Sequence, residues 1–218
     1  MDNKQEVHAG QAVYSKKTLK IYDFWVLGFS NHFLWKCPTQ RIGHQFQTLI
    51  SDNHLDVGVG TGYYFKKYLP HNKRRVALVD MNANSLAAAS DIIKIQNPET
   101  FCRNILEPLS LQTQKFDSVS INYLLHCLPG DMKSKSVVFK HLKEEMNTNG
   151  VLFGSTILGE GTEQNLGAKK LMAIYNKKGI FTNSQDNLAV LTEALNQEFV
   201  DVNIQMIGCV AVFSARKA

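Results

Sequence analysis

The sequence has no long hydrophobic run. Nowhere do apolar residues continue for the roughly 18 positions that a membrane-spanning helix needs. The first residues, Met-Asp-Asn-Lys-Gln-Glu, are polar and no apolar stretch follows them, so we expect no secretory signal. We therefore expect a cytoplasmic protein without a membrane span.

Cysteine is scarce, and its spacing excludes several kinds of site. The four cysteines stand at positions 37, 102, 127 and 209. They form no CxxC pair, and no Cys/His cluster has the spacing of a zinc site. We expect free, mostly buried thiols and no metal site.

The excess of positive charge is small. Lysine and arginine total 24 against 19 acidic residues, for a net charge of +5. The basic residues occur as pairs spread along the chain rather than as one patch, and no nucleic-acid-binding module is visible, which argues against a nucleic-acid partner. With 218 residues, of which 44% are hydrophobic, the chain can bury a core of its own.

Strand-like and helix-like segments alternate after residue 50. Short apolar runs predict strands, and helical patterns separate the first of them, which indicates βαβ units and a parallel sheet. The last two runs are joined by a turn at Gly208 and must be antiparallel. We predict strands at 54–59, 75–79, 100–103, 116–121, 151–157, 200–207 and 209–215, and helices at 61–69, 84–95, 131–146, 166–178 and 186–197.

A glycine-rich turn follows the first predicted strand, in Asp56-Val57-Gly58-Val59-Gly60-Thr61-Gly62. Glycine lets the backbone turn sharply and lets a ligand approach it closely. The third glycine comes one residue too early for the dinucleotide motif G-x-G-x-x-G. An acid before the glycines would repel a pyrophosphate but would suit a cationic ligand. Asp80 ends the second strand, where a carboxylate can accept hydrogen bonds from two ribose hydroxyls.

These motifs resemble those of the class I, Rossmann-like S-adenosylmethionine-dependent methyltransferases. The family's first motif is an acid followed by G-x-G-x-G, its second is a strand that ends in an acid, and its sheet ends in an antiparallel hairpin. The resemblance implies an α/β fold with a seven-stranded, mostly parallel sheet and helices on both faces. It also implies S-adenosyl-L-methionine as the cofactor and S-adenosyl-L-homocysteine as its product. The cofactor-binding positions that it implies are Asp56, Gly58, Gly60, Gly62, Asp80, Met81, Asn104, Ile105 and Asn122.

One position departs from the family pattern. Many members have aspartate after the third strand, where this sequence has Asn104. The carbonyl oxygen of an asparagine can still accept a hydrogen bond from an adenine amino group.

The segment after the fourth strand borders the methyl group and the substrate in that family. Tyr123 is a candidate for catalysis or binding there, and His126 is a candidate catalytic base because an ordinary histidine titrates near neutrality. Alternatively, His126 packs beside the cofactor and takes no proton. His54 and His71 flank predicted elements, and we expect both to face solvent.

Residues 1–50 form a separate N-terminal region in this interpretation, and residues 51–218 form the methyltransferase domain. The segment from 13 to 49 is rich in aromatic residues and predicts two or three helices with a break near Cys37-Pro38. We expect it to form a lid over a small, aromatic or lipophilic substrate, although helix packing explains the same pattern. The candidates for the substrate site are Tyr14, Tyr22, Trp25, Trp35 and, from a later helix, Tyr175.

Methylation of a small molecule is the leading hypothesis. A nucleic-acid or protein methyltransferase is the first alternative, and a cofactor-binding protein that no longer transfers methyl groups is the second. The sequence leaves the acceptor atom open, and it leaves open whether the chain forms a homodimer.

Overall fold

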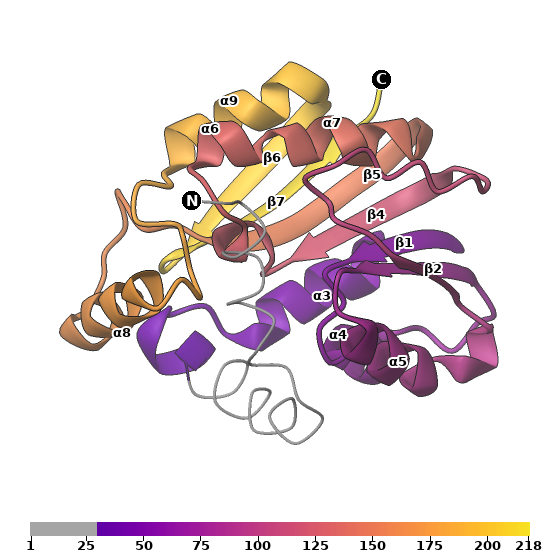
Figure 1. Cartoon of the computed structure of the whole chain (residues 1–218), viewed down its shortest axis with the longest axis horizontal. Coiled ribbons are helices and arrows are strands. Elements are labelled where there is room, and N and C mark those ends of the chain that lie inside the picture. The colour runs from indigo at the N-terminus through magenta and orange to yellow at the C-terminus, as the bar shows by residue number, and fades with distance from the viewer. Residues whose placement is uncertain (1–29) are drawn as a thin grey trace.

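Seven strands form one sheet in the computed structural model, which describes residues 30–218 (Figure 1). The strand order is β3-β2-β1-β4-β5-β7-β6, with β1 to β5 parallel and β7 antiparallel to both of its neighbours. The predicted parallel sheet with a closing hairpin is therefore confirmed. The strands are β1 (Asn53–Val57), β2 (Arg75–Asp80), β3 (Glu99–Cys102), β4 (Phe116–Asn122), β5 (Met146–Ile157), β6 (Val200–Ile207) and β7 (Val210–Arg216).

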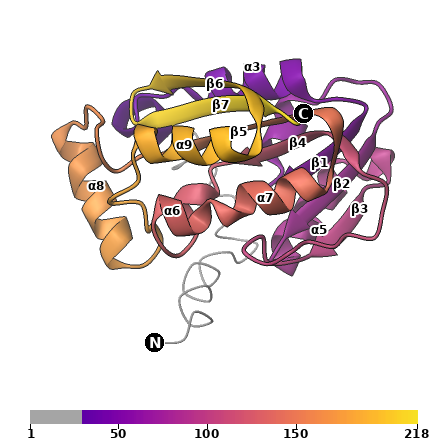
Figure 2. The same cartoon turned by 90° about the horizontal axis from the view of Figure 1, so that it is seen from above.

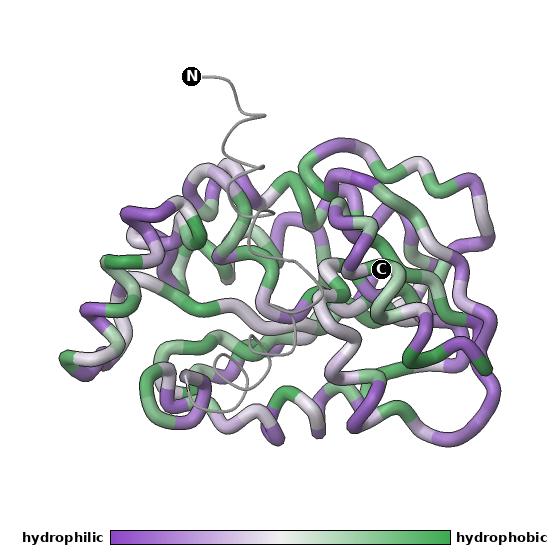
Figure 3. The backbone as a smooth tube through the Cα atoms, turned by 60° about the horizontal axis from the view of Figure 1, so that its bottom comes forward, coloured by the Kyte–Doolittle hydropathy of each residue, from purple (hydrophilic) through white to green (hydrophobic). Residues whose placement is uncertain are grey.

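Helices cover both faces of the sheet. One face carries α3 (Thr39–Leu49), α4 (Tyr63–Tyr68) and α5 (Ala83–Ile92). The other carries α6 (Met132–Lys135), α7 (Val137–Glu144) and α9 (Leu188–Glu198), while α8 (Leu166–Lys177) lies to one side (Figures 1 and 2). The outer helices alternate between hydrophilic and hydrophobic residues, purple and green in Figure 3, as expected where one helix face packs on a sheet. Within residues 30–218, no helix combines the length and the hydropathy needed to cross a membrane.

Alternating side chains of β2 build the two cores. Val76 and Leu78 pack in the cluster that contains Phe46 of α3 and Phe65 of α4. Ala77 and Val79 belong to the cluster on the opposite face, beneath α7 and α9. This period of two is the reason why a continuous apolar run predicts a strand that is buried on both sides.

The helix predicted over 131–146 differs in the structure. It is divided into α6 and α7 at Ser136, and β5 already begins at Met146, which pairs with Phe116. Asn149 has a φ of 63° beside Gly150, inside β5, where the register with β4 shifts. The Asn-Gly pair predicts a helix end, but a bulge in a strand needs the same left-handed backbone.

The strand order creates a ligand site. From β1 the chain continues to β2 and β3 on one side, whereas β4 and β5 lie on the other. Between β1 and β4 the crossovers therefore diverge, which leaves a crevice at the carboxyl ends of these two strands. The glycine loop begins at this point, directly after Val57.

Candidate active site

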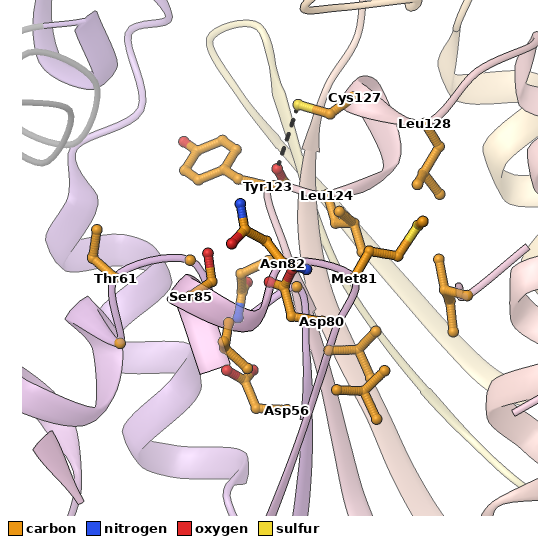
Figure 4. A pocket seen from close by; sticks show the side chains of 18 of the residues that line it. Asp56, Thr61, Asp80, Met81, Asn82, Ser85, Tyr123, Leu124, Cys127 and Leu128 are labelled. Carbon is orange, nitrogen blue, oxygen red and sulfur yellow. Dashed lines mark hydrogen bonds between the residues drawn. The ribbon is translucent and has the colours of Figure 1, made fainter. Parts of the chain in front are cut away.

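A cavity opens at the carboxyl ends of β1, β2 and β4 (Figure 4). Asp56 lies at the bottom of the close-up with Asp80 above it, and Tyr123, Leu124 and Cys127 form the upper wall. The structure brings together all nine positions predicted for the cofactor, and Tyr123 with them. They are Asp56, Gly58, Gly60, Gly62, Asp80, Met81, Asn104, Ile105 and Asn122.

The glycine loop has left-handed backbone at all three glycines, with φ of 74°, 72° and 52° at Gly58, Gly62 and Gly60. A Cβ on Gly58 would lie 2.8 Å from the side chain of Leu124, and one on Gly62 would lie 3.0 Å from the backbone of Ala89. A Cβ on Gly60 would meet nothing within 4 Å. Gly58 and Gly62 therefore serve packing as well as the turn, whereas Gly60 leaves its backbone open to the cavity.

Asp80 ends β2 with its carboxylate beside backbone amides. The amide of Asn82 donates to Oδ1 at 2.8 Å, and the amides of Gly60 and Val59 also lower the pKa of Asp80. Burial outweighs them and raises the pKa above its ordinary value. The amides hold the carboxylate in place at the cavity wall, where it can accept hydrogen bonds from a ligand's hydroxyl groups.

Asp56 is buried at the bottom of the cavity, with 8% of its surface exposed. Burial raises its pKa to about 7, and the neighbouring charge of Asp80 acts in the same direction. The hydroxyl of Ser120 on β4 donates to Oδ1 of Asp56 and opposes this rise. A cation near Asp56 would favour the ionised carboxylate further.

His54 does not face solvent, so that prediction is wrong. Its side chain is fully buried, with Nδ1 2.8 Å from Oγ of Ser118 and Nε2 3.0 Å from Oγ of Ser120. The ring stacks on Phe153, and burial lowers the pKa of His54 to about 3. The signal for this burial is the alternation Ser118-Val119-Ser120 in β4, which places two hydroxyls on one face of a buried strand. His71 is exposed, as predicted.

Two asparagines line the cavity with their amide groups. Oδ1 of Asn104 accepts from the backbone N–H of Leu106 at 3.1 Å. Oδ1 of Asn122 accepts from the hydroxyl of Ser155 at 3.0 Å, and its buried Nδ2 has no hydrogen-bond partner in the described part of the chain. An unpaired buried donor costs free energy, so this amide is suited to a ligand that brings an acceptor.

Of the two candidates after β4, Tyr123 lines the cavity and His126 does not. Tyr123 lines the cavity with a φ of 54°, and its amide donates to the carbonyl of Ser155 at 2.8 Å. His126 lies behind the wall, where Nδ1 accepts from the amide of Ile157 at 3.4 Å and the ring contacts Phe181. Burial, with the nearby charge of Lys135, lowers the pKa of His126 to about 3. This placement favours packing over proton transfer, the second of the two interpretations that the sequence left open.

Two of the aromatic candidates for the substrate site, Trp35 and Tyr175, lie outside the cavity. Trp35 is buried to 1% exposure against Phe181, and Tyr175 packs on the same phenylalanine with a centroid distance of 4.9 Å. Neither residue lines the cavity. Tyr14, Tyr22 and Trp25 fall outside the described residues.

Several cavity residues were absent from the sequence-based prediction. Ser85 follows Asn82, the N-cap of α5, by three residues, so the start of the helix predicted at 84–95 was the available signal. The others belong to the loop after β4, to the start of α4 and to the segment after α8, and only the folded chain brings them together. They include Tyr64, Leu124, Cys127, Leu128, Pro129 and Ile180.

The donor set fits a cationic nucleoside rather than an anionic one. Two carboxylates and an open glycine backbone lie beside an unpaired amide, and among residues 30–218 the cavity lining has no lysine and one arginine, Arg103, next to Asn104. Within the same range, His, Cys, Asp and Glu side chains form no group of three that could hold a metal ion.

Comparisons with known proteins agree with this geometry. A family described as "Methyltransferase domain" matches residues 55–152. The chain is 38% identical to the physcion biosynthesis cluster O-methyltransferase of Aspergillus chevalieri, over 95% of both chains. It is 36% identical to demethylluteothin O-methyltransferase of Streptomyces thioluteus, over 97% of this chain and 92% of the other.

A solved structure shows the same fold. The N-methyltransferase NodS from Bradyrhizobium japonicum, in complex with S-adenosyl-L-homocysteine, superposes with a TM-score of 0.60 at 16% identity. The alignment covers 92% of this chain and 97% of NodS. The chain therefore belongs to the class I, Rossmann-like S-adenosylmethionine-dependent methyltransferases.

Proposed function

We propose that this enzyme transfers the methyl group of S-adenosylmethionine to a hydroxyl oxygen of a small aromatic or lipophilic molecule. One observation carries the proposal: the cavity that contains the predicted cofactor positions continues along an apolar wall. This wall, the acceptor side, consists of Leu124, Cys127, Leu128, Pro129 and Ile180. A mostly apolar cavity with a few polar groups suits a small organic ligand.

The cofactor has a consistent place among the polar residues. We assign the ribose hydroxyls to Asp80 and the adenine to Asn104 and Ile105, and we assign the cationic methionine part to Asp56 and Asn122. Gly58, Gly60 and Gly62 form the turn beneath it, with Met81 at the ribose end. When bound, S-adenosylmethionine supplies a methyl group on a sulfonium, which is a good leaving group. The protein's task is then alignment, because correct placement of two reactants removes much of the barrier.

The ionisable groups in and beside the acceptor side, Cys127 and Tyr123, offer no base near neutrality, which favours an acceptor that ionises readily by itself. Burial raises the pKa of Tyr123 well above its ordinary value and that of Cys127 to about 12, so both are protonated near neutrality. His126 is buried behind the wall. A phenol has a pKa of about 10, and such an acceptor ionises more readily than an alcohol. The two O-methyltransferase relatives support the same acceptor atom.

In this proposal, residues 1–50 form a lid over the acceptor, and residues 51–218 bind the cofactor. The described part of the N-terminal region packs close to the cavity, since Phe46 of α3 stacks on Tyr64 with a centroid distance of 5.9 Å. Tyr64 lines the cavity. Tyr14, Tyr22 and Trp25 remain our candidates for contact with the substrate.

The acceptor atom is tested with matched compounds. The enzyme is incubated with methyl-labelled S-adenosylmethionine and with 1-naphthol, 1-naphthylamine or 1-naphthalenethiol, which differ only in the acceptor atom. Methylation of the naphthol, with equimolar release of S-adenosylhomocysteine, is expected. Preferential labelling of the amine or the thiol would contradict the oxygen assignment. Labelling of RNA or protein only would favour the first alternative function, and binding without release of S-adenosylhomocysteine the second.

A substitution tests the acceptor side itself. Ile180→Trp adds volume to the apolar wall, and we expect a rise in KM for the naphthol of about tenfold or more with little change in affinity for S-adenosylhomocysteine. Ile174→Trp is the control, because Ile174 lies on α8, is 38% exposed and does not line the cavity. Equal effects of the two variants would contradict the placement of the acceptor.

A further inference from the structure

A chain of buried hydrogen bonds leads from the cavity into the protein. It runs from Asp56 through Ser120, His54 and Ser118 to Ser51. The strand register explains the arrangement: His54 lies opposite Ser118 and Asp56 opposite Ser120, on the central strand pair β1 and β4. Because side chains two residues apart point to the same face of a strand, both pairs face the helices α3 and α4.

The chain of hydrogen bonds has a defined donor-to-acceptor direction when Asp56 is ionised. A carboxylate only accepts, so the Ser120 hydroxyl donates to Asp56 and presents a lone pair to His54. Nε2 of His54, at 3.0 Å, must then carry the ring proton. A neutral imidazole has one N–H, so Nδ1 accepts from the Ser118 hydroxyl at 2.8 Å.

The outer end of the hydrogen-bond chain is compatible with this direction, and Ser51 Oγ also lies 2.8 Å from Ser118 Oγ. Ser118 Oγ accepts from the backbone N–H of Ser51 at 2.9 Å. The Ser51 hydroxyl in turn donates to the carbonyl of Asn53 at 2.8 Å. The Ser51 N–H, the Ser118 hydroxyl, the ring N–H of His54 and the Ser120 hydroxyl then all donate toward Asp56, and their summed dipoles stabilise its negative charge.

A protonated Asp56 can still accept from Ser120 through its carbonyl oxygen, but it also permits the opposite direction. Its O–H would donate to Ser120, Ser120 would donate to Nε2, and the ring proton would sit on Nδ1. A ring proton on Nδ1 of His54 would therefore indicate a protonated Asp56, although the two side chains share only the Ser120 hydroxyl.

We propose that His54 is a positioning residue that acts through Ser120 and presents Asp56 to the cofactor as an ionised carboxylate. The inference rests on the proposed role of Asp56 in binding the cationic part of the cofactor. Other ionisable groups lie near these hydrogen bonds. Asp80 and Tyr64 lie near Asp56, and the charge of Arg74 lowers the pKa of His54. Burial keeps the imidazole neutral, as the direction of the chain requires.

The first test follows S-adenosylhomocysteine binding by calorimetry between pH 6 and 8.5. His54→Phe suits the aromatic surroundings of Phe46, Phe65 and Phe153 but removes the N–H that orients Ser120. We expect its affinity to be about tenfold weaker at pH 6.5 and to converge with wild type near pH 8.5, where Asp56 ionises without help. A purely structural effect would weaken binding equally at every pH. His44→Phe, the same change at an exposed position of α3, should leave the profile unchanged.

The second test reads the tautomer in the unaltered protein. In ¹⁵N-histidine spectra of the S-adenosylhomocysteine complex at pH 8, the His54 resonance should show the proton on Nε2. A proton on Nδ1, or a pH profile of His54→Phe equal to wild type, would overturn the proposal. Asp56→Asn separates the two hypotheses: if it retains wild-type affinity, the role of Asp56 and this inference both fail. If it loses affinity while His54→Phe has a wild-type profile, only this inference fails.

Discussion

Nζ of Lys135 lies 2.8 Å from Oδ2 of Asp186, and both side chains are fully buried. The ammonium also donates to the carbonyl of Thr182 at 2.8 Å. Thr182 in turn donates from its hydroxyl to the carbonyl of Leu128, a residue of the acceptor side. The ion pair therefore ties the segment after α8 to the wall of the cavity.

Removal of one partner should destabilise the protein strongly. We expect Lys135→Met to lower the free energy of unfolding by about 3–5 kcal/mol, because Asp186 would remain buried without a counter-charge. The double variant Lys135→Met/Asp186→Leu should recover much of this loss, since it leaves no uncompensated charge. Urea denaturation of the single and double variants measures both effects, and additive losses would contradict a coupled pair.

A comparison of Gly60 and Gly161 distinguishes the cost of backbone strain from the effect of a Cβ on ligand binding. Gly60 and Gly161 have φ of 52° and 70°, and a Cβ at either position would meet nothing within 4 Å. Alanine at either site should cost about 1–2 kcal/mol of stability, because both are left-handed. Only Gly60 lines the cavity, so only Gly60→Ala should also weaken S-adenosylhomocysteine binding beyond its effect on folding. Thermal melts and calorimetry compare them, and equal affinities would show that the cofactor does not approach Gly60.

Local signals were enough to predict the frame of the site. The apolar runs of β1 and β2 and the glycines after Val57 are each readable within a few neighbouring residues, and so is the Gly208 turn. They place Asp56 and Asp80 at adjacent strand ends. These two carboxylates of the cavity lining could therefore be named before the fold was known.

Contacts between distant segments could not be predicted in the same way. His54 is separated from Ser118 by 64 positions, and nothing near His54 indicates that the register of β1 and β4 will pair them. Trp35 reads as a pocket aromatic because its partner Phe181 lies far along the chain. The Asn149-Gly150 pair is ambiguous for a different reason, since a helix end and a β-bulge use the same backbone conformation.

The raised pKa of Asp56 makes stability depend on pH. In the unfolded chain this carboxyl loses its proton near pH 4, whereas in the folded protein it does so at about pH 7. The folded state therefore binds the extra proton between these values, and its stabilising effect is lost as the pH rises through 7. From pH 5 to pH 8, wild type should lose about 2–3 kcal/mol more stability than Asp56→Asn, as measured by urea denaturation. Parallel changes in the two proteins would contradict the raised pKa.

His126 should have the opposite dependence on pH. Its pKa falls to about 3 on folding, so below pH 6.5 the unfolded chain binds a proton that the folded protein does not. This contribution to stability is present above pH 6.5 and is lost as the pH falls toward 3. Between pH 7 and pH 5, His126→Phe should lose about 2 kcal/mol less than wild type in urea denaturation. Equal losses of stability in the two proteins would contradict the lowered pKa of His126 and would favour its alternative role as a general base.

The binding of S-adenosylhomocysteine to the wild-type protein and to Asp80→Ala tests the central claim, that the crevice at the ends of β1, β2 and β4 holds the cofactor. Asp201→Ala is the control, because that side chain is 74% exposed on β6, away from the cavity. Isothermal titration should show saturable one-to-one binding to wild type and to Asp201→Ala, and a loss of about tenfold or more for folded Asp80→Ala. Absence of binding to wild type, or equal affinity of Asp80→Ala, would contradict the assignment.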